Sequence, residues 1–96
     1  MKYTDNIKYE CELDISLINQ TTRGKRIIKM AKSIIGDDGI WIIRTWGIRF
    51  SLRKLVDFLY RYGLDVFDLE YGSVTKIYIC KIDSYRIQNS AVFALK

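Results

Sequence analysis

The sequence contains no histidine and no proline, and it has only two cysteines. Without histidine, the chain lacks the most common general base of enzymes and the most common metal ligand of proteins. Cys11 and Cys80 lie too far apart to match a zinc-ligand spacing or a disulfide framework, so we expect both to be buried thiols that act as small hydrophobic side chains. These absences predict a protein that is not an enzyme and has no metal site and no cofactor.

Long apolar runs are also absent. No segment approaches the roughly 18 consecutive apolar residues of a transmembrane helix. The first residues alternate charged with apolar side chains and lack the continuous apolar segment of a signal peptide. The sequence therefore predicts a cytoplasmic protein without membrane contact, and its many isoleucines fit a thermophilic archaeal source.

Hydrophobic residues make up 49% of the 96 residues and charged residues 28%, which is typical of one globular domain. We predict a single domain over 1–96, with a core over about 8–82 and a C-terminal extension of unclear structure over 83–96. The net charge of +5 is uneven, because residues 23–61 hold ten basic and three acidic side chains. Such asymmetry favours nucleic acid or an acidic partner, although solvated helix faces would produce the same pattern.

Hydrophobic periodicity predicts the order strand-helix-strand-helix-strand-strand. Apolar residues alternate with charged ones over 8–15, and β-branched and aromatic residues fill 40–46. Apolar residues at helical spacing precede Gly36 and recur over 52–62, which predicts two helices. Two further strands are predicted over 64–71 and 74–82. On the first helix we expect one inward-facing apolar side, made of Ile27, Ile28, Met30, Ala31, Ile34 and Ile35.

Capping and turn residues mark the element boundaries. Thr21 or Thr22 can cap the first helix, and Ser51 can cap the second. Glycines follow both helices, as a left-handed C-terminal cap prefers. Gly72 and Ser73 are expected to form a two-residue hairpin turn with a positive φ at the glycine.

This order predicts an α/β (α+β) fold, a two-layer β-α-β-α-β-β sandwich. Right-handed crossovers would place both helices on one face of a mixed four-stranded sheet. The other face would stay open unless the tail or a second copy covers it, so a homodimer or protein partner through this face is expected. The side chains expected there are Trp41, Trp46, Phe67 and Tyr78.

Three segments resemble the TusA/SirA-like sulfur-carrier family. ELDI (12–15) is similar to the family's first strand, GDDGIWII (36–43) to its glycine and second strand, and YGLDVFDLEYGSVTKIYICK (62–81) to its closing hairpin. The resemblance covers about residues 12–82 and implies the same β-α-β-α-β-β sandwich.

The chain departs from this family at the reactive motif. The family's cysteine-proline-x-proline motif falls on Gln20, Thr21, Thr22 and Arg23, so neither the thiol nor the prolines are present. Carriage of a persulfide needs a thiolate activated at the helix N-terminus, and Gln20 cannot supply one. What stays is a candidate anion-binding site of free backbone N–H groups, two hydroxyls and basic neighbours, unless the threonines only cap the helix. We therefore predict a non-catalytic binding or accessory module, which acts through protein partners or a small anionic ligand.

The alternative is a nucleic-acid-binding protein. RTWGIRFSLRK (44–54) loosely resembles the basic segment of the Alba family, the small archaeal chromatin proteins with this element order. That family's long basic hairpin is absent, because the strand before the turn carries Asp65, Asp68 and Glu70. Under this alternative, phosphates would be contacted by Lys25, Arg26, Arg44, Arg49, Arg53 and Lys54.

Overall fold

The computed structural model describes residues 6–15, 18, 22–46 and 51–83. The predicted order of elements is confirmed: β1 (Ile7–Glu12), α1 (Thr22–Ile35), β2 (Ile40–Trp46), α2 (Leu52–Tyr60), β3 (Leu64–Glu70) and β4 (Val74–Lys81). Of the predicted features, Gln20, Thr21, Arg49 and nearly all of the 83–96 extension lie outside the described residues.

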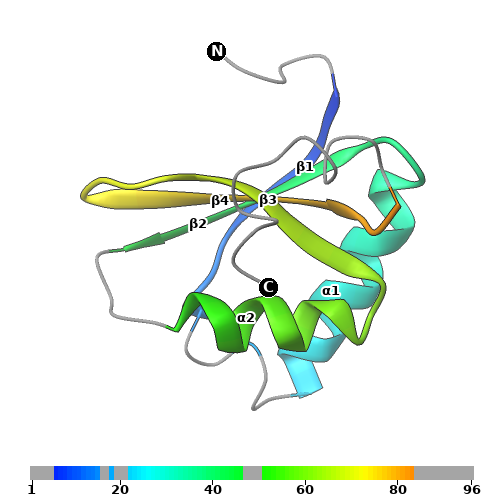
Figure 1. The fold of residues 1–96 in the computed structure, drawn as a ribbon, viewed down its shortest axis with the longest axis horizontal. Coiled ribbons are helices and arrows are strands. Elements are labelled where there is room, and N and C mark those ends of the chain that lie inside the picture. Colours follow the sequence, from blue (N-terminus) through cyan, green and yellow to red (C-terminus); the bar gives the residue numbers. More distant parts are fainter. Residues whose placement is uncertain (1–5, 16–17, 19–21, 47–50, 84–96) are drawn as a thin grey trace.

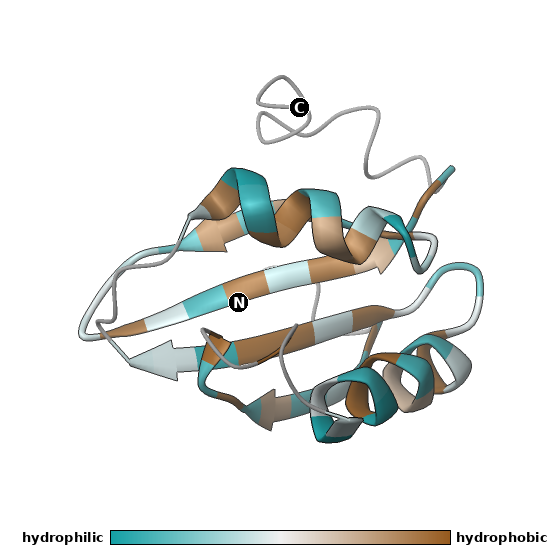
Figure 2. Ribbon diagram, turned by 90° about the horizontal axis from the view of Figure 1, so that it is seen from below, coloured by the Kyte–Doolittle hydropathy of each residue, from teal (hydrophilic) through white to brown (hydrophobic). Residues whose placement is uncertain are grey.

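The four strands form one mixed sheet in the order β1-β2-β4-β3. β1 runs parallel to β2, while β4 lies between β2 and β3 and is antiparallel to both. Both helices lie on the same side of the sheet (Figure 1). α1 packs mainly on β1, with less contact to β2 and β4, and α2 packs on β3, so the two helices cover different parts of the sheet (Figure 2). The predicted two-layer α/β sandwich is confirmed.

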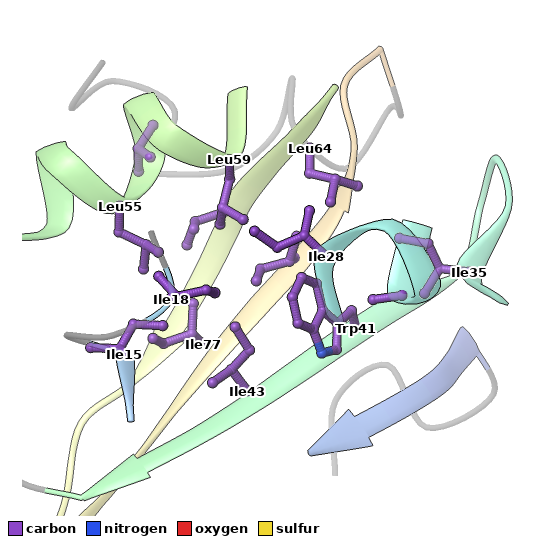
Figure 3. Close-up of a cluster of buried hydrophobic side chains, with 14 residues drawn as sticks. Ile15, Ile18, Ile28, Ile35, Trp41, Ile43, Leu55, Leu59, Leu64 and Ile77 are labelled. Carbon is purple, nitrogen blue, oxygen red and sulfur yellow. The ribbon is translucent and has the colours of Figure 1, made fainter. Parts of the chain in front are cut away.

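The main core lies between the helices and the sheet. Leu55, Val56 and Leu59 of α2 are buried there, in agreement with the helical spacing predicted over 52–62. Trp41 belongs to this core and lies next to Ile28 of α1 (Figure 3). The prediction that Trp41 lies on the open face was therefore wrong, because residue parity along β2 turns its side chain toward the helices.

The inner side of α1 is narrower than the sequence predicts. Ile28, Ala31 and Ile35 are buried, but Met30 and Ile34 are 45% and 46% exposed. α1 rests on the edge half of the sheet, and only one arc of a helix can contact a sheet surface. Met30 and Ile34 lie beside that arc, so the prediction that they face inward was wrong.

The opposite face of the sheet is not open where its apolar residues lie. Phe67 and Tyr78 point to this face as predicted, but they are buried within the single chain. They form a second buried cluster with Ile40, Ile42 and Cys80. Trp46 alone of the four predicted side chains is largely exposed, at 49%.

Three of the predicted boundaries are confirmed, but the first strand, predicted over 8–15, ends at Glu12. The Ser51 Oγ caps α2 by accepting a hydrogen bond from the Lys54 backbone N–H at 3.3 Å. Gly36 and Gly63 follow the two helices with φ of 63° and 77°, a conformation that L side chains rarely adopt. The prediction of a two-residue hairpin turn was wrong. Three residues, 71–73, separate β3 from β4, and Gly72 does not have a positive φ. A three-residue connection does not need the primed turn of a two-residue hairpin.

Neither α1 nor α2, the helices of the described ranges, combines the length and the hydrophobicity needed to cross a bilayer.

Candidate functional site

The junction between β1 and α1 is anchored on both sides of its candidate anion site. After β1, the Leu13 backbone N–H donates to the Arg44 carbonyl at 3.1 Å. Ile15 and Ile18 are buried in the main core. Of the four candidate residues, Thr22 and Arg23 are described, and both are exposed in the first turn of α1. The structure therefore brings a hydroxyl and a guanidinium to the surface at the positive end of the helix dipole.

Gly24 fixes the approach of α1 to this junction. A Cβ atom at this position would overlap the backbone carbonyl oxygen of Ile18, although Gly24 lies inside a helix where alanine is intrinsically preferred. The first turn of α1 therefore packs directly on the preceding chain. The sequence analysis missed this residue, and the signal for it was a glycine within an otherwise strong helical pattern.

The two thiols belong to strands of the sheet, and neither is part of the first turn of a helix. Cys80 is fully buried in β4, in the second cluster, as predicted. Cys11 in β1 is half-buried and packs against the main core. Its Sγ accepts a hydrogen bond from the Trp41 indole Nε1–H at 3.4 Å.

The surroundings of Cys11 disfavour the thiolate. Burial raises the pKa of the Cys11 thiol above its usual value of 9.0, and this effect outweighs the opposing hydrogen bond from Trp41 and the attraction of Arg44. Burial also raises the pKa of Tyr9, with the negative charge of a Cys11 thiolate adding to the effect. A thiol held neutral in this way is a weak nucleophile at neutral pH.

The exposed surface of α1 carries positive charge only. The helix holds five basic and no acidic side chains, and all five are exposed: Arg23, Lys25, Arg26, Lys29 and Lys32. The Lys32 ammonium reaches toward α2, because its Nζ would lie 3.0 Å from a Cβ placed on Gly63. Lys25 and Arg26, two of the predicted nucleic-acid contacts, belong to this surface.

The other predicted nucleic-acid contacts among the described residues are divided between two faces of the molecule. Arg53 and Lys54 are exposed in the first turn of α2, on the helix side of the sheet. Arg44 points to the opposite face of the sheet, where its guanidinium contacts Glu10 at 3.0 Å and Glu12 at 3.6 Å. Two carboxylates therefore offset the charge of Arg44, and it does not join the helix-side cations.

Arg44 is part of a charged row that crosses all four strands. The strand register aligns Glu12 with Arg44, Arg44 with Lys76, and Lys76 with Glu70. The Glu70 carboxylate also accepts a hydrogen bond from the Tyr78 hydroxyl. This row separates the buried apolar cluster from the exposed end of the sheet at Trp46 and Val74, and its cations and anions are equal in number.

Asp37 and Asp38 stabilise a turn. The Asp37 carboxylate contacts the Lys81 Nζ at 2.6 Å, and the Asp38 carbonyl accepts a hydrogen bond from the Asn6 side chain at 3.3 Å. The hydrogen bond and charge of Lys81 lower the pKa of Asp37, and Asp37 raises the pKa of Lys81 in return. The two contacts therefore tie the turn after α1 to β4 and to Asn6, the residue before β1. Within the described ranges, no three side chains of the metal-binding types are grouped closely enough to hold an ion.

Comparison of this chain with protein-family models, curated proteins and solved structures found no match. The resemblances to the sulfur carriers and to Alba therefore stay predictions from the sequence. The positively charged surface of α1, together with the junction that precedes it, is the candidate site that the geometry offers.

Proposed function

We propose that this protein is a non-catalytic binding module on a sulfur-carrier-like scaffold, and that it recognises an acidic protein partner through α1. The observation that carries this proposal is the charge of that helix: five exposed cations and no anion on fourteen residues. A surface of one sign attracts partners of the opposite sign and speeds their association. Thr22 and Arg23 at the start of the helix extend the same surface toward the junction.

The thiols support a binding role over sulfur transfer. A carrier needs an accessible thiolate of low pKa, whereas Cys80 is buried and the pKa of Cys11 is raised. Both thiols also lie within strands, where no helix dipole stabilises a negative sulfur. The scaffold resemblance therefore comes without the chemistry of that family.

Nucleic-acid binding is the second candidate, because a cation-rich helix also attracts phosphates. Arg53 and Lys54 on α2 favour it by adding basic side chains on the same side of the sheet. The ion pairs of Arg44 count against it, since they remove one predicted phosphate contact from the surface.

Fluorescence anisotropy separates the two candidates. The labelled probes are an acidic peptide of irregular sequence and a random DNA duplex, each titrated across a salt series. We expect the peptide to bind at low salt and its affinity to fall as the salt concentration rises. The Lys29→Glu variant should lose this binding. Lys8→Glu is the matched control, because it makes the same charge change on an exposed side chain of β1.

Each outcome decides between the candidates. Tighter binding of the duplex, with a salt slope that falls by about 1 for each α1 or α2 cation removed, would replace the proposal with the nucleic-acid function. Absence of binding to either probe at low salt would overturn both. Equal losses in Lys29→Glu and Lys8→Glu would show that net charge acts without a site on α1.

A further inference from the structure

The exposed surface of α1 is not only charged, because it also carries large apolar side chains. Met30 and Ile34 are 45% and 46% exposed, and they lie one helical turn apart. Ile27, half-buried against the main core, precedes them on the same side of the helix. We call Ile27, Met30 and Ile34 the apolar stripe. Its spacing of three and four residues is that of a helix-packing surface.

The apolar stripe lies on the side of α1 that faces away from α2. At about 100° per residue, Lys25 and Lys32 fall on one side of the buried arc and the stripe falls on the other. The Lys32 Nζ would lie 3.0 Å from a Cβ placed on Gly63, the residue that follows α2. The side of α1 that carries Lys25 and Lys32 is therefore the side toward α2. The stripe therefore borders the β1 edge of the molecule, because β1 is the outer strand beneath α1.

Two of the five cations border the apolar stripe. The same helical geometry places Arg23 in line with the stripe and Arg26 along its outer side, whereas Lys29 lies on the solvent-facing side, nearer to Lys25. Arg23 and Arg26 are exposed, and α1 has no acidic side chain with which they could pair within the helix. The surface thus combines an apolar line with a positive border.

We infer that the apolar stripe is the docking surface for an acidic amphipathic helix of a partner protein. This inference rests on the proposed function and specifies the partner. The partner's apolar residues, spaced three and four apart, pack on Met30 and Ile34, and its carboxylates face Arg23 and Arg26. The bound helix lies beside α1 and extends the helix layer past β1.

This surface fits a helix better than other polyanions. Phosphates are bound by cations and gain nothing from two aliphatic side chains. Interfacial binding to a membrane needs a wide apolar face, usually with aromatic residues, whereas the main apolar arc of α1 is already packed on the sheet.

A designed peptide pair tests the inference. The first peptide has about 20 residues, with leucine at helical spacing and glutamate elsewhere; the second has the same composition in scrambled order. We expect the 96-residue chain to bind the helical peptide at least tenfold more tightly than the scrambled peptide. Met30→Ala with Ile34→Ala should remove about tenfold of that affinity while leaving the binding of the scrambled peptide unchanged.

Two sets of matched controls distinguish this inference from the proposed function. Tyr71→Ala with Val74→Ala removes exposed apolar side chains elsewhere and should not affect affinity. Arg23→Glu with Arg26→Glu should weaken binding of the helical peptide more than Lys25→Glu with Lys32→Glu, which changes the charge equally on the other flank. If both peptides bind equally and Met30→Ala with Ile34→Ala has no effect, the docking surface is wrong while the acidic-partner proposal stands. If neither peptide binds at low salt, both are wrong.

Discussion

The two helices share one layer of the fold but use their sequences differently. α2 buries Leu55, Val56 and Leu59, and its other apolar residues are half-buried except Tyr60, whose hydroxyl suits contact with water. α1 leaves Met30 and Ile34 exposed, although neither has a polar group. Packing on the sheet therefore accounts for the apolar pattern of α2. It does not explain why α1 has exposed apolar residues as well.

The two helices also differ in charge. α1 carries five basic and no acidic residues, whereas α2 carries two basic residues and Asp57. Both helices place cations in the first turn, where the helix dipole disfavours them. Helix stability does not explain these cations, and on α1 nothing on the same helix offsets them. The comparison teaches that α2 serves the core, whereas core packing alone does not explain the exposed surface of α1, which is the surface that we propose binds a partner.

The contrast between the two helices requires that the buried side of α2 stabilises the fold. We therefore expect the largest loss of stability from a substitution on that side. Leu59 is fully buried in the main core, and Leu59→Ala removes most of its side chain. We expect the free energy of unfolding to fall by about 2–5 kcal/mol, measured by urea denaturation. The neighbouring Tyr60→Ala, at a side chain 54% exposed, serves as the control and should cost far less. Similar losses for both would mean that α2 is not packed as described.

The next largest effect on stability concerns the packing of α1 on the chain that precedes it. Gly24→Ala places a Cβ against the backbone carbonyl of Ile18, which cannot rotate away as a flexible side chain would. Alanine's better helix propensity, worth about 1 kcal/mol, opposes this clash. We expect the clash to prevail with a net loss of about 1–3 kcal/mol in the free energy of unfolding.

Ser33→Ala is the matched control for that substitution, because Ser33 is exposed on the same helix and alanine should stabilise it slightly. A stabilising Gly24→Ala would show that α1 does not approach the junction closely.

The sequence predicted the elements of this fold because each carried a local signal. Alternation over β1, the helical spacing of Leu55 and Leu59, the Ser51 cap and the glycines after both helices are all set by neighbouring residues. β2 was predicted from its continuous run of β-branched and aromatic side chains. Such signals need no knowledge of the tertiary structure.

The errors arose where tertiary contacts decide. How much of α1 is covered depends on its position over the sheet edge, so the exposure of Met30 and Ile34 could not be read from spacing. The side to which Trp41 points depends on which face receives the helices. The candidate site was half predicted: its positive charge is visible in the sequence, whereas the ion pairs that remove Arg44 from it require the register of β1 and β2.

A smaller effect tests the start of α2. The Ser51 Oγ satisfies the Lys54 backbone N–H, which has no partner within the helix. Ser51→Ala should lower the free energy of unfolding by about 1 kcal/mol. Ser73→Ala, at an exposed loop position outside any helix, is the control and should change little. Equal effects from both would mean that the cap adds nothing to the stability of α2.

The smallest effect on stability is expected on the apolar stripe, and it is the most informative for the comparison. Met30→Ala with Ile34→Ala removes side chains that are nearly half exposed and replaces them with the best helix former. We expect the free energy of unfolding to change by no more than about 0.5 kcal/mol, because surface substitutions rarely exceed this value. A loss comparable to that of Leu59→Ala, measured in the same urea titration, would show that the stripe belongs to the core and that both helices serve packing alone. An unchanged stability with lost affinity for the helical peptide would instead separate the two roles of α1 on one helix.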